Sequence, residues 1–246
     1  MNANRNYLIA AFAVLLLGLG IPMVAAQSNT VQYQHSAGIV TLTTEDIDIR
    51  VTGVSQAPHF HWWDPNNPTV DYHVMFPKIF EANDTNGNGV FDLGTDDMIG
   101  APFALPTTDW DFSGFDVETD GENTTAIHFN FTTTSTFDPR GSDTAGQYGN
   151  IPDLDEFEVY IEIRVHLDMT SPGEFKFDVI IDGWKWTYDD SILVMQFTIT
   201  ESAHGQQEPG DDAPSGFQHT GTQFEFSNGY MQYEETALAA QNTLQV

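Results

Sequence analysis

Residues 157–168 read FEVYIEIRVHLD, in which apolar side chains occupy every odd position and polar or amphipathic side chains every even position. A period of two is that of a β-strand with one buried face, because successive side chains leave a strand on opposite sides. Residues 174–182 repeat this alternation after the turn formers Ser171-Pro172-Gly173. The two segments therefore predict an antiparallel hairpin.

The same period recurs along most of the chain. Further strands are expected at 38–43, 46–51, 58–63, 70–76, 125–133, 192–200, 222–226 and 229–234, with surface loops at 136–155 and 202–219. A short helix at 235–241 is the only helical alternative after residue 26, and the last four residues read as a strand. We predict an all-β fold, a single antiparallel β-sandwich domain over 27–246, with jelly-roll topology as one option.

Charge and cysteine content exclude several classes of function. The 246 residues include 36 Asp and Glu against 7 Lys and Arg, giving a formal net charge of −29. This surface repels nucleic-acid phosphates and anionic lipids. The absence of Cys excludes disulfides, thiolate metal sites and cysteine nucleophiles. Because such a charge destabilises the compact state unless cations screen it, we expect a salt-rich or calcium-rich environment.

Residues 1–26 have the features of a secretory signal peptide. Arg5 lies in a polar segment, an apolar run covers 8–19, and Val24-Ala25-Ala26 provides small residues for cleavage. The alternative is an uncleaved membrane anchor, because 7–26 approaches the ~20 residues that span a bilayer. We expect cleavage, no later membrane span, and a secreted or cell-surface location. Asn-x-Thr triplets that begin at Asn83, Asn123 and Asn130 fit an N-glycosylated exported protein.

Residues 84–97, DTNGNGVFDLGTDD, have the spacing of a calcium-binding loop. Asp84, Asn86, Asn88 and Asp92 fall at loop positions 1, 3, 5 and 9, and a glycine falls at position 6, where the chain must turn sharply. Position 12, normally an acid, is Thr95, and Asp96 is the candidate in its place. Two neutral Asn ligands favour weak binding, with Kd about 10⁻⁴–10⁻³ M. The alternative is a turn rich in Asn and Gly that binds no metal.

This loop resembles the calcium loops of dockerins and thrombospondin type 3 repeats. The resemblance implies calcium ligation through Asp84, Asn86, Asn88, the Val90 carbonyl and Asp92. Calcium would then stabilise the folded chain rather than take part in a reaction.

A second candidate metal site consists of histidines. His59 and His61 share one face of a predicted strand, and His73 follows on the next strand. Three imidazoles arranged in this way can hold zinc or copper with an open coordination position. The alternative is that these rings simply pack beside Trp62 and Trp63 on a half-buried sheet.

Residues 59–62, HFHW, are similar to the His-x-His-Trp segment of α-carbonic anhydrases, with Asp71 echoing the acid of that family. The resemblance implies a zinc site, although its substrate loop is not found. The sequence contains no nucleophile elbow, phosphate loop or His-Glu-x-x-His motif, and no catalytic residue is assigned. Trp184 and Trp186 are candidates for stacking on sugars, as in a carbohydrate-binding module.

A wider pattern involves residues 72–81, the calcium-like loop, the DWDF of 109–112 and the WKW of 184–186. It resembles secreted, acidic, β-rich archaeal proteins of unassigned activity, and this implies an envelope or extracellular role.

Three hypotheses about function follow from the sequence. The first is a calcium-stabilised structural or adhesive cell-surface protein that self-associates by strand addition into a filament or surface layer or meets other surface proteins. The second is a secreted zinc or copper enzyme or binding protein, and the third is a glycan-binding module.

Overall fold

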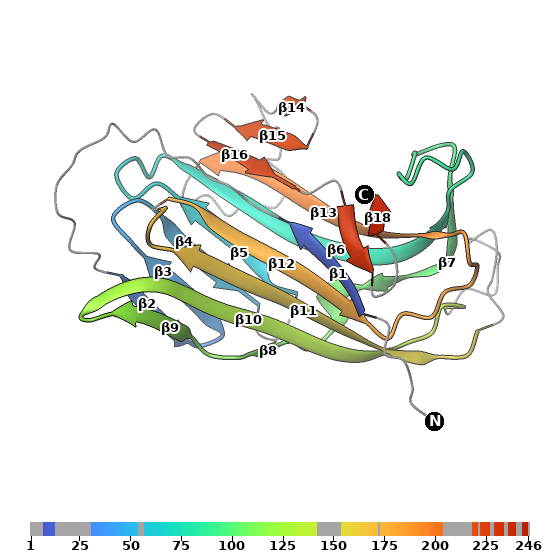
Figure 1. Cartoon of the computed structure of the whole chain (residues 1–246), viewed down its shortest axis with the longest axis horizontal. Coiled ribbons are helices and arrows are strands. Elements are labelled where there is room, and N and C mark those ends of the chain that lie inside the picture. Colours follow the sequence, from blue (N-terminus) through green and yellow to red (C-terminus); the bar gives the residue numbers. More distant parts are fainter. Residues whose placement is uncertain are drawn as a thin grey trace.

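The computed structural model describes residues 7–12, 31–53, 57–141, 154–171, 173–203, 218–220, 222–226, 229–233, 236–239 and 243–245 (Figure 1). These residues form strands β1 to β18 and one 3₁₀ turn, η1 (Leu105–Thr107), and they contain no α-helix. The all-β prediction is therefore confirmed. The described residues also contain no helix that is long and apolar enough to cross a membrane.

The first sheet has eight strands built around the predicted hairpin. Its order is β18 (Thr243–Gln245), β17 (Thr236–Ala239), β1 (Tyr7–Phe12), β12 (Phe175–Asp182), β11 (Phe157–Asp168), β10 (Asn123–Phe137) and β8 (Asp111–Phe112), with β9 (Asp116–Asp120) also paired to β10. All the pairs are antiparallel, and Leu167 lies opposite Phe175 in the β11–β12 hairpin. The hairpin prediction is confirmed.

The second sheet has seven strands around the long β6. Its order is β13 (Ile192–Ala203), β6 (Val70–Asn83), β5 (His59–Trp63), β4 (Asp48–Thr52), β3 (Ile39–Thr43) and β2 (Gln32–Ser36), with β7 (Asp97–Ala104) also paired to β6. Strands β14 (Gln218–Thr220), β15 (Gln223–Phe226) and β16 (Gly229–Gln232) form a small third sheet. Ala37 and Gly38 both have positive φ, as a two-residue hairpin turn between β2 and β3 requires.

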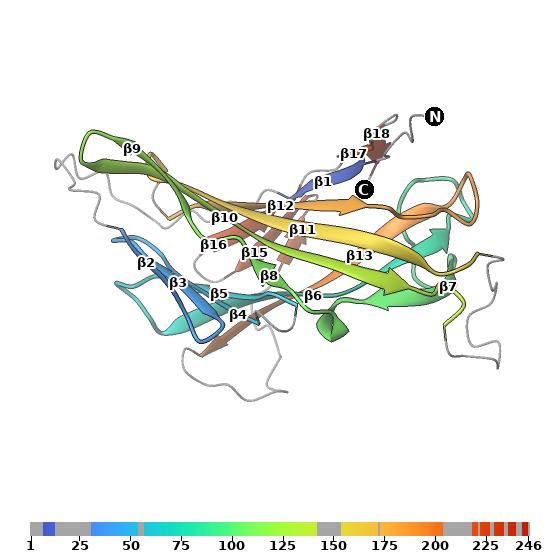
Figure 2. The ribbon, with the colours of Figure 1, turned by 90° about the horizontal axis from the view of Figure 1, so that it is seen from below.

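The two large sheets pack as two layers, and their facing side chains form the core (Figure 2). Aromatic rings from both sheets meet there. Phe60 of β5 lies over Phe177 of β12 with ring centroids 5.6 Å apart, and it meets the edge of Phe131 of β10 at 6.2 Å. Alternation along each strand sends the intervening side chains to the outer faces of the sandwich, where the candidate sites lie.

The order of the strands settles two further predictions. Consecutive strands β2 to β6 are neighbours in one sheet and β10 to β12 in the other, so each sheet contains a meander and not the jelly roll that the sequence left as an option. The crossovers place β13 beside β6, and β1 between β12 and β17. The short helix expected at 235–241 is wrong, because Thr236–Ala239 forms β17 between β1 and β18. A seven-residue helix is marginal without packing, whereas a strand here gains hydrogen bonds on both sides.

Three other predicted segments lie partly outside the described residues. Of the predicted leader, 7–12 form β1 on the edge of β12, and its cleavage stays a prediction. Within the predicted loops, β10 extends to Phe137 and β13 to Ala203, while 142–153 and 204–217 are outside the described residues.

Candidate metal centres

The three predicted histidines come together on the outer face of the second sheet. In β5, His59 and His61 alternate with Phe60 and Trp62, whose side chains are buried in the core. In the neighbouring β6, His73 lies directly opposite His61. Strand alternation and one cross-strand pair are therefore sufficient to gather the three imidazoles.

The spacing of the ring nitrogens suits a metal ion. His73 Nδ1 and His59 Nε2 lie 3.3 Å apart, and one ring nitrogen from each of the three histidines lies within 4.8 Å of the others. The ring of His61 has its centroid 4.0 Å from that of His59 and 4.2 Å from that of His73. Nitrogens 3.3 Å apart subtend about 110° at an ion with bonds of about 2.0 Å, which is a tetrahedral angle.

Asp71 supports the histidines from β6. Its Oδ1 lies 3.1 Å from His73 Nε2 and 3.8 Å from His61 Nδ1. A carboxylate in this position holds the N–H of one ring nitrogen and leaves the other nitrogen free of its proton, as in many zinc sites. With Nε2 of His73 beside Asp71, its Nδ1 faces Nε2 of His59 at 3.3 Å, so these two nitrogens either share a hydrogen bond or could hold a metal between them.

The protonation states also favour a cation. Burial, together with the nearby rings of His61 and His73, lowers the pKa of His59 to about 3. Burial alone would raise the pKa of Asp71, but hydrogen bonds from His61 and His73 hold it at about 2. At neutral pH a neutral imidazole therefore lies beside an ionised carboxylate, and metal ions require both of these states in their ligands.

The calcium-like loop connects β6 to β7, and hydrogen bonds join its predicted ligand side chains to one another and to the loop backbone. The Asp84 carboxylate accepts hydrogen bonds from the backbone N–H groups of Gly87 (2.7 Å), Asn88 (3.2 Å) and Gly89 (2.7 Å). The amides of Asn86 and Asn88 both reach Asp92 Oδ2, at 2.7 and 2.9 Å. Asn86 and Asn88 thus face Asp92 through their amide nitrogens, while their Oδ1 atoms accept the backbone N–H groups of Asn88 (2.9 Å) and Val90 (2.8 Å). Calcium ligation by these residues stays a prediction.

The remaining two predicted calcium ligands lie differently. Asp96 is buried, and its Oδ1 and Oδ2 accept backbone N–H groups from Thr85 (2.9 Å) and Asp92 (2.8 Å). These two hydrogen bonds lower its pKa. Asp96 thus joins the beginning of the loop to its later part through the backbone. Val90 lies exposed, and its N–H donates to Asn88 Oδ1 at 2.8 Å.

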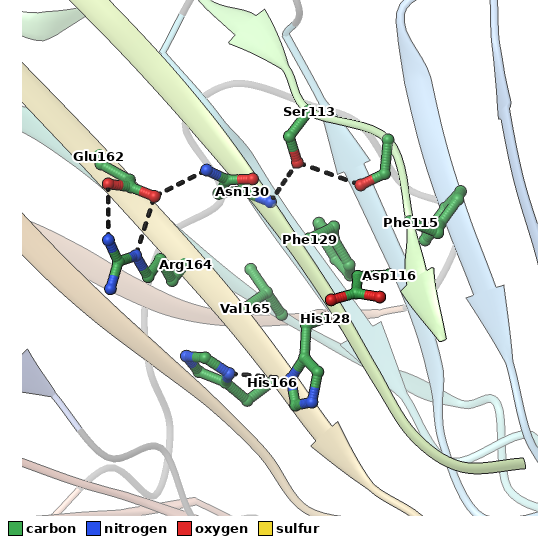
Figure 3. A pocket seen from close by; sticks show the side chains of 11 residues that line it. Ser113, Phe115, Asp116, His128, Phe129, Asn130, Glu162, Arg164, Val165 and His166 are labelled. Carbon is green, nitrogen blue, oxygen red and sulfur yellow. Dashed lines mark hydrogen bonds and ion pairs between the residues drawn. The ribbon is translucent and has the colours of Figure 1, made fainter. Parts of the chain in front are cut away.

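Sequence reasoning missed a pocket of about 310 Å³ on the outer face of the first sheet (Figure 3). One wall is a polar network in which Glu162 accepts hydrogen bonds from Arg164 (2.8 and 3.1 Å), Asn130 (2.6 Å) and Tyr160 (3.0 Å). Burial raises the pKa of Glu162, but these hydrogen bonds outweigh it and keep the pKa below its ordinary value. Asn130 Nδ2 carries two hydrogens, one of which is donated to Glu162, so N-glycosylation of Asn130 stays a prediction.

The other wall of this pocket contains two histidines, His128 of β10 and His166 of β11, which lie opposite each other. Both occupy polar positions of strands that the sequence predicted. The sequence pattern could therefore predict that both histidines lie on outward faces of their strands, but not that they are cross-strand partners.

The tryptophan pair proposed for glycan binding is partly engaged in packing. The ring of Trp184 stacks on Phe137 at 5.3 Å and meets the edge of Phe157 at 5.9 Å. This ring lies at the end of the core, while Trp186 is half-buried. Glycan binding at these positions stays a prediction.

No protein-family model, curated protein or solved structure matches this chain. Its function is therefore argued from its own residues.

Proposed function

We propose that this chain is an exported β-sandwich protein that binds a divalent transition-metal ion through His59, His61 and His73. The observation that supports this most strongly is the convergence of three imidazole nitrogens within 4.8 Å beside the carboxylate of Asp71. Imidazole ligands suit zinc and copper, and the tetrahedral spacing of His59 and His73 favours zinc. The role proposed is metal binding, without an assigned reaction.

The test is a zinc titration of the full chain after removal of metal with a chelator. Isothermal calorimetry should give one equivalent of zinc for the wild type and no comparable binding for His61→Ala or His73→Ala. The matched control is His35→Ala, which changes an exposed histidine of β2 and should leave the titration unchanged. Equal zinc binding by the wild type and His61→Ala would contradict the proposal.

Asp71→Asn tests the supporting carboxylate separately. Loss of a carboxylate behind a ligating histidine typically weakens metal binding 10–100-fold. We expect a decrease of this size with unchanged stoichiometry. If instead the affinity stayed the same, Asp71 would have no part in orienting the rings.

A second candidate function is that of a calcium-stabilised structural or adhesive protein of the cell surface. The observation that favours it is the set of hydrogen bonds that links Asp84, Asn86, Asn88 and Asp92 within one loop between two paired strands. Calcium that binds only to the folded chain stabilises it by about 1.4 kcal/mol at tenfold excess over Kd. Self-association by strand addition would use the exposed β2 or the outer edge of β13.

Thermal unfolding with calcium and with a chelator tests this second candidate. The wild type should unfold at a higher temperature in calcium, and Asp84→Ala should abolish the difference. Light scattering in the same two solutions reports assembly. The calcium proposal fails if the wild type shows the same melting temperature and the same mass in both.

A further inference from the structure

His128 and His166 lie on the outer face of the sandwich opposite to that of the first histidine cluster. They alternate with the buried residues Ile127, Phe129, Val165 and Leu167, so their rings point away from the core and into the pocket of Figure 3. The two histidines are direct cross-strand partners on β10 and β11. This pair shares no residue with the proposed site at His59, His61 and His73.

The two rings face each other through the same type of nitrogen. His128 Nδ1 and His166 Nδ1 lie 2.9 Å apart. The other nitrogen of each ring lies beside a carboxylate, with His128 Nε2 3.4 Å from Glu118 Oε1 and His166 Nε2 3.3 Å from Asp178 Oδ2. Asp178 is in turn held by Lys176, at 2.8 Å. A row of acid, histidine, histidine and acid thus runs across β9, β10, β11 and β12.

This arrangement raises the question of what lies between the two Nδ1 atoms. In one arrangement a ring with its proton on Nδ1 donates a hydrogen bond to the other ring. With both ring protons on Nε2, beside the carboxylates, the two Nδ1 lone pairs would face each other at 2.9 Å and repel. A metal ion between them relieves this repulsion, and with carboxylates behind both rings this is the pattern of histidine ligands in metal sites.

We propose that His128 and His166 form a second transition-metal site, selective for ions that accept tetragonal geometry, such as Cu²⁺. Two nitrogens 2.9 Å apart subtend about 90° at an ion with bonds of about 2.0 Å. Right angles between neighbouring ligands are those of square-planar and tetragonal copper and nickel sites, whereas the first cluster has a tetrahedral spacing.

The pocket supplies the remaining coordination positions. Among the described residues, no third histidine or carboxylate joins this pair at the close spacing of the first cluster. The remaining ligands of the ion would be water or small molecules within the 310 Å³ pocket, which Asp116 also lines. Glu118 and Asp178 add negative charge beside the pair, which favours a cation over an anion.

The experiment is a copper(II) titration of the metal-free full chain, followed by electron paramagnetic resonance and calorimetry. The double variant His59→Ala/His61→Ala, which leaves only His73 of the first cluster, should still bind one equivalent of Cu²⁺ with hyperfine splitting from two nitrogens. Adding His128→Gln should lower the affinity of this site at least tenfold, while adding His35→Ala should not. Glu118→Gln, a positioning variant, should weaken binding with unchanged stoichiometry.

A second measurement covers the case in which the His59→Ala/His61→Ala variant does not fold. In the otherwise unaltered chain, His128→Gln should remove one equivalent of Cu²⁺ and leave the zinc titration intact, with circular dichroism confirming the fold. If copper binding is the same with and without His128, the pair shares only a proton and the proposal is wrong. Because zinc and copper are read out by different variants, the failure of one site is distinguishable from that of the other.

Discussion

Glu81→Gln should destabilise the fold strongly, because Glu81 is a buried hub of hydrogen bonds. Its side chain is on β6 and is 3% exposed. Oε1 accepts the N–H groups of Thr187 (2.8 Å) and Tyr188 (3.2 Å) and the hydroxyl of Ser191, and Oε2 accepts the N–H (3.0 Å) and the hydroxyl (2.8 Å) of Thr187. This one carboxylate holds the segment between β12 and β13 against β6.

The size of the expected destabilisation follows from the hydrogen bonds that a glutamine amide cannot accept. Glutamine keeps the volume but replaces one acceptor oxygen with an NH₂ group that faces other donors. Hydrogen bonds to a charged group contribute about 1.5–3 kcal/mol each, and buried donors left unpaired add to the loss. Losing one to two such bonds predicts a decrease of about 3 kcal/mol in the free energy of unfolding. For a chain of this size the melting temperature should fall by about 6–12 °C.

Urea denaturation followed by tryptophan fluorescence measures this loss. Glu158→Gln is the matched control, because Glu158 is exposed on β11 and should change stability by no more than about 0.5 kcal/mol. The zinc titration should also be unchanged, because eight strand residues, or about 26 Å, separate Glu81 from His73. The argument is refuted if Glu81→Gln and Glu158→Gln unfold at the same urea concentration.

Three further predictions concern acidity, a turn and the core. In the metal-free chain, the free energy of unfolding should fall as pH decreases from about 6.5 to about 3. The reason is that His59 binds a proton in the unfolded chain over this range, whereas the folded ring, with its pKa lowered to about 3, does not. Urea titrations at successive pH values should show a flatter slope for His59→Gln. Gly183→Ala should lower the free energy of unfolding by at least about 1 kcal/mol more than Gly121→Ala. Both residues have positive φ, but only at Gly183 would an added Cβ meet a backbone oxygen, that of Glu158, at 2.5 Å. Equal melting temperatures of the two variants would contradict this. Phe60→Ala should cost about 3–5 kcal/mol, because the ring is fully buried between the sheets, and a loss below about 1 kcal/mol would show that the sheets do not pack as described.

The strands and the first histidine cluster were predictable because both depend on local order. A period of two identifies a strand and its buried face, and His59 and His61 share a face for the same reason. His73 needed only the adjacent strand. The turn from Asp84 to Asp92 was likewise predictable from its Asn and Gly residues, while calcium binding there stays a prediction.

The second histidine pair and the Glu81 hub were not predictable, because both depend on long-range placement. His128 and His166 are 38 positions apart, and shifting β10 by two residues along β11 would keep every buried face buried while separating them. Glu81 looks like a polar interruption at the end of a strand, and its partner Thr187 is 106 positions away. The helix expected at 235–241 failed for the same reason, because its strand partners were unknown.

The two histidine clusters lie on opposite outer faces of the sandwich, with the phenylalanine core between them. Packed sheets are about 10 Å apart, so ions held at these clusters could not share a bridging oxygen, which requires a separation of about 3.5–4 Å. An ion at one cluster would therefore be too far from an ion at the other to share a ligand, and this rules out a coupled binuclear unit within one molecule. If both proposed sites bind metal, each can be filled, emptied or removed by mutation without a change in the occupancy of the other.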